Sequence, residues 1–382
     1  MSEIQFFQLG SIAFAVSLVV SLLIVMSQKW HGGLSHDHDL DGVQKVHTTA
    51  VPRIGGLGVI AGIVFACLAF RHQSGPTLSI GKDMFLLLVA SLPAFLAGLI
   101  EDFTKRVSVR MRLMATALSA LVASALLGAT VSELDLWGVD ALLAFTPFAL
   151  LVTAVVVAGG SNAINIIDGF NGLSSSTIVI MAAGLAAVAL RCGDNLVASL
   201  GVMGIGATLG FVMLNYPRGR LFLGDGGAYF LGFWVSEMAV LLLVRNSSVN
   251  AWQVLSICAY PVIEVLFSIY RRRFIQKVSP GAPDALHLHT LVYRRLVFKY
   301  VDKNSSNPWK RNAAVACIIP PVVAVCVALS VLVGTSIAMS MLTVLAQVVI
   351  YVAVYGRLVR GRWTTGEAGR IDADVRVNAK LR

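Results

Sequence analysis

Residues 141–172 read ALLAFTPFALLVTAVVVAGGSNAINIIDGFNG, and this stretch combines the two patterns that decide the fold of the chain. The run from Ala141 to Ala158 is apolar and carries no charged residue. Such a run is a candidate transmembrane helix, because a helix needs roughly 20 apolar residues to cross ~30 Å of hydrocarbon. Polar side chains follow directly, between Asn162 and Gly172. Apolar runs with polar stretches at their ends recur through the whole chain.

The composition excludes a soluble globular protein. Hydrophobic residues make up 57% of the 382 residues and charged residues only 13%, with a mean hydropathy of +0.79. We therefore predict an all-α, polytopic membrane helix bundle with about eleven transmembrane helices. The eleven apolar runs are 6–26, 55–70, 84–100, 113–130, 141–158, 177–190, 196–214, 229–244, 252–270, 313–333 and 336–355.

The basic residues predict the orientation of these runs, because lysine and arginine gather on the cytoplasmic side of membrane proteins. With the N-terminus periplasmic and the C-terminus cytoplasmic, 26 of the 30 basic residues fall inside. The four left outside are Arg71, Lys82, Arg191 and Arg245. Basic loops next to anionic lipid also account for the net charge of +10, so no nucleic acid partner is expected.

The chain is predicted to hold one transmembrane domain, residues 1–355, followed by a basic, polar cytoplasmic tail, residues 356–382. The one long hydrophilic loop covers residues 271–312. The five cysteines form no CxxC pair, so neither a disulfide framework nor a zinc site is indicated. The first run lacks a basic segment before it, which favours a retained anchor over a cleaved signal.

Four polar stretches and the long loop are expected on the cytoplasmic side. The first contains Lys45, His47 and Arg53, followed by Gly55 and Gly56. Glycines at a helix start let a ligand approach backbone N–H groups, and nearby basic residues favour phosphate. An ordinary turn with cytoplasmic charges explains the same residues equally well. The histidines and aspartates of segment 36–39 are interpreted as a solvated loop, because their spacing fixes no closed metal site.

The second stretch contains Glu101 and Asp102 at the end of an apolar run. Two acids there are costly unless they reach water, a cation or a partner. They could hold a divalent ion or accept a proton from a substrate. The alternative is a helix end whose acids pair with the basic residues that follow.

The third stretch is the most specific one. Asn162, Asn165 and Asp168 recur every three residues and therefore lie on one face of a helix that is otherwise apolar. The pairs Asp-Gly and Asn-Gly, which follow, end the helix. Because a turn alone would not need two asparagines inside an apolar run, we expect these side chains to serve a site.

The fourth stretch places Asp225 among three glycines just before an apolar run. Asp225 is either a helix N-cap or an oxygen ligand for Mg²⁺, which uses one or two carboxylates together with substrate phosphates. In the long loop, His287 and His289 are two residues apart and cannot share a helix face. No third zinc ligand is near, so a phosphate or sugar contact is favoured, with Arg294 and Arg295 as anion partners. Ordinary surface residues are the alternative.

Together these stretches resemble the polyprenyl-phosphate N-acetylhexosamine-1-phosphate transferases over nearly the whole chain. The family's first loop is matched by Lys45, His47 and Arg53, and its acidic pair by Glu101 and Asp102. The other motifs fall on Asn162, Asn165, Asp168, Asp225, His287 and His289. The resemblance implies a bundle of ten or eleven helices in the bacterial inner membrane, with the active site facing the cytoplasm.

The resemblance also implies the reaction and the roles. A sugar 1-phosphate would pass from a UDP-sugar to undecaprenyl phosphate, with release of UMP, and Mg²⁺ or Mn²⁺ would assist. The catalytic residues would be Asp102, Glu101 and Asp168, and the metal ligands Asp225 and Asp168. Substrate contacts would come from Lys45, His47, Arg53, Asn162, Asn165, Asn171, His287, His289, Arg294 and Arg295. Membrane lipid is a further partner, and a homodimer is compatible with the family.

Three departures from the family pattern refine this prediction. Glu101 stands where the family usually has Asp, and Asn171 stands where an Asp associated with uridine recognition is common. Thr290 replaces a further histidine, and the triple histidine of the peptidoglycan enzymes is missing. The histidine motif favours the branch that initiates O-antigen (lipopolysaccharide), enterobacterial common antigen, capsule or teichoic acid. The phospho-N-acetylmuramoyl-pentapeptide transferases are the alternative.

A membrane transporter or flippase is the alternative from another class. Transporters place ionisable residues near the middle of the bilayer on broken helices. The only acids well inside the apolar runs are Glu237 and Glu264, and Glu264 lies toward the inner end of its run. The distribution of acids therefore favours the enzyme.

Overall fold

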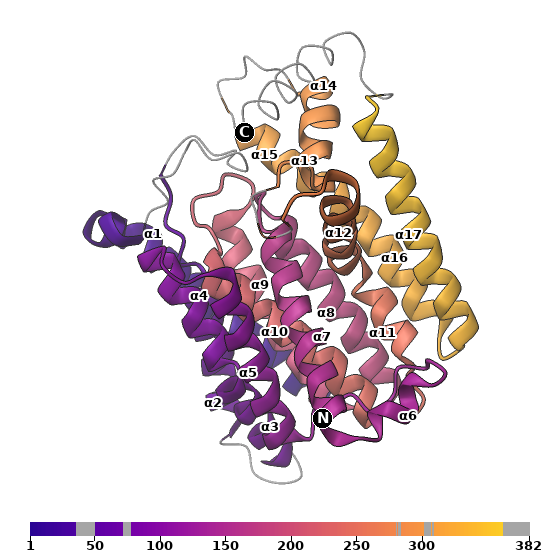
Figure 1. Cartoon of the computed structure of the whole chain (residues 1–382). Helices are drawn as coiled ribbons and strands as arrows, with labels where there is room; N and C mark the ends of the chain where they lie inside the picture. Colours follow the sequence, from indigo (N-terminus) through magenta and orange to yellow (C-terminus); the bar gives the residue numbers. More distant parts are fainter. Residues whose placement is uncertain are drawn as a thin grey trace.

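The computed structural model describes residues 1–35, 50–71, 78–279, 281, 284–301, 307 and 309–361. In these residues the regular structure is helical, and the long helices lie side by side in one bundle (Figure 1). The first half contains α1 (Glu3–Ser35), α2 (Gly56–Arg71), α3 (Leu78–Ala90), α4 (Leu92–Thr104), α5 (Val109–Leu127), α6 (Val139–Leu143), α7 (Thr146–Ile167), α8 (Leu173–Arg191) and α9 (Asn195–Asn215).

The second half begins with the buried helix α10 and ends with the long helix α17. It contains α10 (Gly224–Arg245), α11 (Ala251–Ile257), α12 (Ala259–Tyr270) with the π-helical turn η1 (Arg271–Gln276), α13 (Leu288–Val292), the π-helical turn η2 (Tyr293–Val297), α14 (Phe298–Tyr300), α15 (Trp309–Ala314), the 3₁₀ turn η3 (Val315–Cys317), α16 (Ile319–Val333) and α17 (Ile337–Val359).

The predicted class, an all-helical polytopic membrane protein, is confirmed. Within the described residues, eight helices are long and apolar enough to span a membrane, and two bent pairs raise the number to ten. The one expected run that is not among these spans is 55–70. It forms α2, whose 16 residues fall short of a typical span. The structure therefore supports eight to ten spans, and the orientation of the termini stays a prediction.

Three apolar runs that were expected to be continuous are interrupted. The run 84–100 is bent by 40° between α3 and α4, where Pro93 lies in the first turn of α4. The run 252–270 is bent by 86° between α11 and α12. The run 141–158 contains the end of α6, and α7 begins only at Thr146, beside Pro147, and continues to Ile167. Proline favours such first turns because it lacks an N–H group, and hydropathy alone does not register the break.

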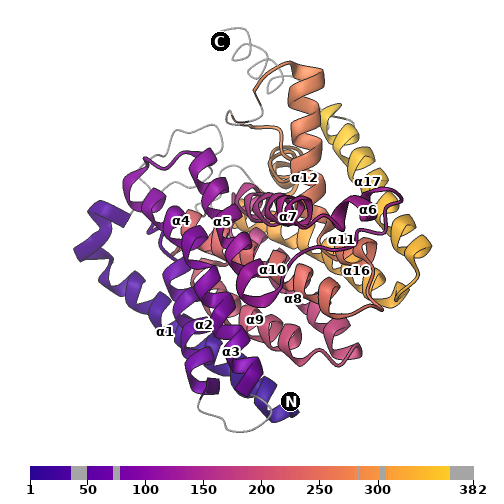
Figure 2. The ribbon, with the colours of Figure 1, turned by 60° about the horizontal axis from the view of Figure 1, so that its bottom comes forward.

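Helix α10 lies in the middle of the bundle (Figure 2). It is the most buried of the candidate spans, and its side chains Phe230, Phe233 and Trp234 are fully enclosed. Phe230 packs edge-on against Phe95 of α4, with ring centroids 6.0 Å apart. The peripheral helix α17 is the least buried span. An interior α10 allows one end of this helix to be surrounded by several others.

Glycines bring α2 and α4 very close to the start of α10. A Cβ atom at Gly98 of α4 would lie 2.6 Å from the backbone of Asp225, and one at Gly56 of α2 would lie 2.4 Å from the backbone nitrogen of Gly227. Real Cβ atoms do not approach backbone so closely, so only glycine fits at these two positions. The first turn of α10 is therefore enclosed by two neighbouring helices.

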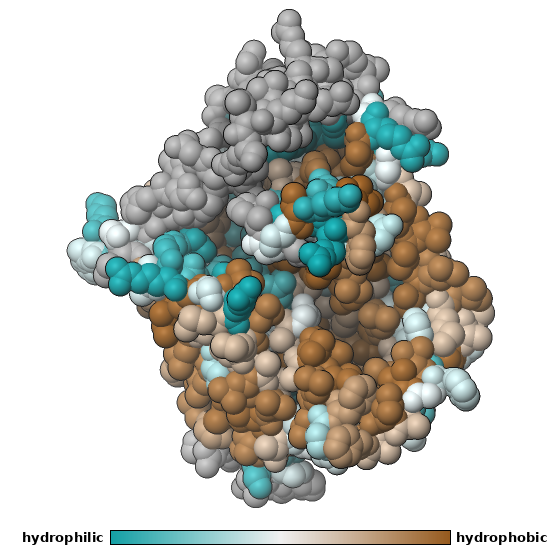
Figure 3. All heavy atoms as spheres, in the orientation of Figure 1, coloured by the Kyte–Doolittle hydropathy of each residue, from teal (hydrophilic) through white to brown (hydrophobic). Residues whose placement is uncertain are grey.

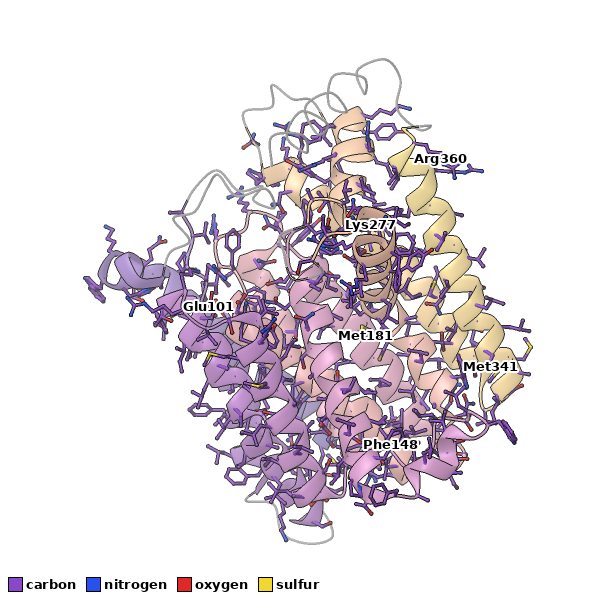
Figure 4. The ribbon with its side chains drawn as sticks, viewed as in Figure 1. Glu101, Phe148, Met181, Lys277, Met341 and Arg360 are labelled. Atoms are coloured by element: carbon purple, nitrogen blue, oxygen red, sulfur yellow. The ribbon has the colours of Figure 1, made fainter. Side chains whose placement is uncertain are left out.

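The surface has the pattern expected of a membrane protein. On the face shown in Figure 3, a broad belt of hydrophobic residues covers the body of the bundle, and hydrophilic residues gather mainly at one end. Glu101, Lys277 and Arg360 lie toward this end, whereas Phe148 and Met341 lie toward the other (Figure 4). Large apolar side chains are exposed in the belt, as expected where lipid replaces water.

Candidate active site

Asp225, in the first turn of α10, contacts polar side chains from three other segments. Its Oδ1 accepts a hydrogen bond from Asn165 Nδ2 at 3.1 Å and lies 3.4 Å from Arg53 Nη2. Its Oδ2 forms an ion pair with Arg112 Nη1. The side chain is 14% exposed, so the carboxylate is shielded but reachable. Two arginines from separate segments thus converge on one carboxylate.

Asp102 lies behind Asp225 and holds the start of α10. Its two oxygens accept the backbone N–H groups of Asp225 at 2.8 Å and Gly226 at 2.9 Å. Its Oδ1 also lies 3.4 Å from Arg53 Nη2, and the side chain is 1% exposed. A carboxylate on the first N–H groups of a helix satisfies donors that have no partner within the helix. The catalytic role of Asp102 stays a prediction.

Glu101 and Asp102 are adjacent in sequence but face different surroundings. Glu101 Oε2 accepts the backbone N–H of Val107 at 2.6 Å. It thereby closes the turn between α4 and α5, in which Lys105 has a left-handed backbone with φ of 56°. The acidic pair is therefore not a joint pair of ligands in this arrangement.

The asparagines of α7 lie along α10. Asn165 contacts Asp225, and Asn162 Oδ1, one turn earlier, accepts the hydroxyl of Tyr229 at 3.1 Å. Tyr229 follows Asp225 by one turn of α10, as Asn162 precedes Asn165 by one turn of α7. Two successive turns of each helix therefore contribute a polar group to the contact. The guanidinium of Arg112 lies over the Tyr229 ring, 5.5 Å from its centroid.

Asp168 ends α7 and forms part of the same charged region. Its Oδ1 accepts a hydrogen bond from the Ser174 hydroxyl. Burial raises the pKa of Asp168 to about 7, although the Ser174 bond and the charge of Arg53 oppose this shift. Such a carboxyl group exchanges its proton near neutral pH.

Asn171 joins the segments around Pro217 and Asn312 and is almost fully buried. Its Nδ2 donates to the carbonyl oxygen of Pro217 at 3.0 Å, and its backbone N–H donates to Asn312 Oδ1 at 2.7 Å. Asn215 Oδ1 accepts the next N–H, that of Gly172, at 2.7 Å. These bonds hold the turn after Asp168 in place, and a uridine contact by Asn171 stays a prediction.

The histidine segment is buried against α12. His287 Nδ1 lies 2.9 Å from Glu264 Oε1, and the ring of His289 stacks on that of His287 with centroids 5.2 Å apart. Burial lowers the pKa of His289 to about 4, so its imidazole is neutral at pH 7. Arg294 and Arg295 follow on η2, and burial lowers the pKa of Arg294.

The structure brings most of the described candidates to one end of the bundle, but not all the predicted contacts are tested. Lys45 and His47 lie outside the described residues. The sequence did not predict a contact between Arg112 and Asp225; Arg112 was considered only as one of the basic residues that could pair with Glu101 and Asp102. A sequence clue to the position of Arg112 was Ser108, a residue type that often caps the start of a helix. In the structure the Ser108 hydroxyl accepts the N–H of Met111, and Arg112 lies in the first turn of α5. Glu264 was noted only as an acid near the inner end of its run.

Fold and site together define a polytopic membrane protein with an aspartate–arginine cluster at the hydrophilic end of its helices. A family model described as glycosyl transferase family 4 matches residues 84–243. This match includes the acidic pair, the asparagine motif and Asp225.

Relatives extend this likeness beyond the matched residues. The chain is 30% identical over 287 residues to a protein of Bacillus subtilis named probable undecaprenyl-phosphate N-acetylglucosaminyl 1-phosphate transferase, covering 73% of this chain and 75% of that protein. An undecaprenyl-phosphate alpha-N-acetylglucosaminyl 1-phosphate transferase of Yersinia pestis is 27% identical, over 67% of this chain and 69% of its own length. A phospho-N-acetylmuramoyl-pentapeptide-transferase of a Geobacillus species is 27% identical, over 63% and 75%. The chain belongs to glycosyl transferase family 4.

Proposed function

We propose that this protein transfers an N-acetylhexosamine 1-phosphate from a UDP-sugar to undecaprenyl phosphate and releases UMP. The observation that carries the proposal is the cluster in which Asp225 meets Arg53 and Arg112 at the enclosed start of α10. The names of the relatives from Bacillus subtilis and Yersinia pestis support the same reaction class.

The cluster suits two phosphate-bearing substrates. Arginine binds phosphate oxygens through paired N–H groups, and the start of a helix favours anions. Arg53 and Arg112 both pair with Asp225, so their guanidinium groups lie together where a phosphate would bind. Asp102, fixed on the backbone behind, keeps Asp225 at the mouth of this anion site.

The donor set also fits Mg²⁺, although the described residues contain no group of three or more potential metal-binding acids, histidines or cysteines. Mg²⁺ uses one or two carboxylates together with substrate phosphates, and Asp225 supplies a partly exposed carboxylate. A bound Mg²⁺ would neutralise the diphosphate and stabilise the departing UMP. Asp225 would hold it, and Asp168 is the second candidate.

The reaction itself requires little covalent chemistry from the protein. An oxygen of the lipid phosphate attacks the β-phosphorus of the UDP-sugar, and the bond from that phosphorus to the oxygen bridging to UMP breaks. A phosphate monoester has a second pKa of about 6 and is mostly doubly ionised at pH 7. If Asp225 alone holds the metal ion, Asp168, whose pKa burial raises to about 7, is suited to accept the proton that remains on part of the lipid phosphate. Positioning by Arg53 and Arg112 then provides the rest of the catalysis.

An apolar cavity gives the lipid tail a place next to the site. The cavity has a volume of about 320 Å³ and lies among α7, α10, α11 and α12. Ile164, which directly precedes Asn165 in the sequence, lines it together with Val131 and Trp252. A polyprenyl chain in this cavity would bring its phosphate to the end of α7. The length of undecaprenol requires that most of the chain lie in the bilayer.

This reaction would be the first membrane step in making a bacterial surface polysaccharide, at the cytoplasmic face of the inner membrane. The segment His287 to Thr290 lacks three consecutive histidines, which favours the polysaccharide branch over the pentapeptide transferases. The relative from Geobacillus keeps the second branch as an alternative substrate class.

Product analysis tests this proposal. Purified protein is incubated with undecaprenyl phosphate, Mg²⁺ and a panel of UDP-sugars that includes UDP-N-acetylmuramoyl-pentapeptide, and the lipid products are identified by mass spectrometry. We expect a lipid-linked N-acetylhexosamine diphosphate together with an equal amount of UMP. Formation of only the pentapeptide product would assign the other branch, and the absence of any new lipid and of UMP would reject the enzyme.

A further inference from the structure

His287 lies between two buried acids, with a hydrogen bond at one ring nitrogen and a longer contact at the other. Its Nδ1 lies 2.9 Å from Glu264 Oε1, and its Nε2 lies 3.6 Å from Asp284 Oδ2. Glu264 Oε1 also accepts the backbone N–H of Leu288 at 3.0 Å, so it acts as an acceptor and His287 Nδ1 carries a proton. The side chain of His287 is 7% exposed and that of Glu264 is 1% exposed.

The second acid is itself fixed to α12 and η1. Asp284 Oδ2 accepts the Ser268 hydroxyl at 2.9 Å and forms an ion pair with Arg271, and its Oδ1 accepts the N–H of Leu286 at 2.9 Å. Burial alone would raise the pKa of Asp284, but His287, this N–H group and Arg271 outweigh it and hold the pKa below its ordinary value. His287 therefore lies in a preformed setting of charged partners.

His289 has the opposite character. It is 3% exposed, and among the described residues its Nδ1 has no hydrogen-bond partner. Its ring is parallel to that of His287 within 10°, and Phe170 packs against it edge-on at 5.7 Å. A Cβ atom at Gly169 would lie 3.8 Å from His289 Nε2. The Nε2 edge therefore faces the turn that begins at Asp168.

We propose that the two histidines have separate tasks: His289 contacts the nucleotide sugar through Nε2, and His287, fixed by Glu264, positions His289 by stacking. This inference rests on the proposed function, because it names the group that meets a sugar or diphosphate oxygen beside Asp168. His287 and Glu264 are positioning residues and do not touch the substrate.

Amide replacements separate the two tasks, because the amide nitrogen of Asn lies near the Nδ1 position of His and that of Gln lies near the Nε2 position. His287→Asn keeps the bond to Glu264 but loses the ring that stacks on His289, whereas His287→Gln loses both contacts. His287→Asn is therefore expected to raise the KM for the UDP-sugar less than His287→Gln does. For His289 the order reverses. His289→Gln keeps activity, and His289→Asn raises KM about tenfold or more, as expected for the loss of a hydrogen bond to a charged group.

Glu264 gives a second, independent test. Glu264→Gln retains an acceptor oxygen for both N–H groups and is expected to keep the KM of the wild type. Glu264→Ala is expected to raise KM about tenfold, with a smaller effect on kcat. When His289→Ala is already present, Glu264→Ala is expected to raise the KM little further. Two substitutions that remove the same interaction do not have additive effects.

Glu237→Gln is the matched control, since Glu237 is also fully buried in the bundle but has no described polar partner. It is expected to leave KM unchanged. A purely structural Glu264 would lower the melting temperature in Glu264→Ala without changing KM, and that result would overturn the proposal. Activity in His287→Gln together with its loss in His287→Asn would also overturn it, because His287 would then use Nε2.

The failure of the proposed function can be recognised separately. If the wild type binds a UDP-sugar but forms no lipid product, the transferase proposal fails, and calorimetric titration of UDP-N-acetylglucosamine into the same variants still decides the roles of the histidines. We expect the dissociation constant to follow the KM pattern. If the wild type binds no UDP-sugar, the division of tasks is overturned as well.

Discussion

At the scale of single residues, the carboxylate of Asp225 illustrates what a sequence pattern can reveal. The glycines around it and the apolar run after it predicted a helix start with an accessible carboxylate, and Asp225 does lie in the first turn of α10. The three-residue spacing of Asn162, Asn165 and Asp168 likewise predicted a shared face. Arg112 was not predicted, because its contact with Asp225 joins residues 113 positions apart and leaves no local pattern.

The opposite roles of Asp102 and Glu101 could not be predicted for a similar reason. Adjacent side chains at a helix end point in different directions, and their partners depend on which helices pack there. The backbone N–H groups bound by Asp102 belong to α10, and the N–H bound by Glu101 belongs to the following turn.

Arg112 provides the prediction that belongs to this scale. Arg112→Ala should lower kcat/KM about 100-fold, because a phosphate-binding guanidinium would be lost, and Arg112→Lys should recover only part, since an ammonium lacks the paired N–H groups. Steady-state UMP release checks this order. Arg106→Ala, in the exposed turn after α4, is the control and should retain activity. Equal activity of wild type and Arg112→Ala would remove Arg112 from the site.

At the scale of the helices, hydropathy located the apolar segments better than their ends. All eleven runs overlap helices, but the run at 84–100 is divided between α3 and α4, and that at 252–270 between α11 and α12. Breaks arise where a proline or a neighbouring helix alters the backbone, and neither changes the mean hydropathy of the segment. The 86° bend at Cys258 matters for the site, because α12 then leads to the histidine segment.

The contact between α4 and α10 gives the prediction at this scale. Gly98→Ala should lower activity about tenfold or more, because a Cβ there meets the backbone of Asp225 at 2.6 Å and displaces the first turn of α10. Gly159→Ala in α7 is the matched control, since no atom lies within 4 Å of a Cβ at that position. UMP release by the purified variants, measured with their melting temperatures, checks the difference. Similar activity in both would show that α4 and α10 can separate without loss.

At the scale of the whole molecule, composition and charge were the strongest guides. An apolar belt with hydrophilic residues concentrated at one end follows directly from the alternation of apolar runs and basic stretches (Figure 3). From the sequence, distant polar stretches could be expected to meet only because the predicted topology places them on the same side of the membrane. Their exact partners required the packing of α2, α4, α5 and α7 around α10.

The orientation of the bundle is tested by labelling. Single cysteines are introduced at Trp137, which is fully exposed between α5 and α6, and at Lys277, which lies at the hydrophilic end, in a variant without the five native cysteines. The basic loops predict that a membrane-impermeant maleimide labels position 137 in intact cells with a permeable outer envelope. Position 277 should react only after the inner membrane is opened. The reverse pattern would place the site outside.

The most direct test of the central claim is UMP release by Asp225→Asn. The variant keeps the size of the side chain but removes the charge that meets Arg53 and Arg112 and that would hold Mg²⁺. With UDP-N-acetylglucosamine and undecaprenyl phosphate, we predict that UMP release by folded protein falls at least about 100-fold. Asp83→Asn, in α3, should retain the wild-type rate. Turnover near that of the wild type in Asp225→Asn would contradict the account.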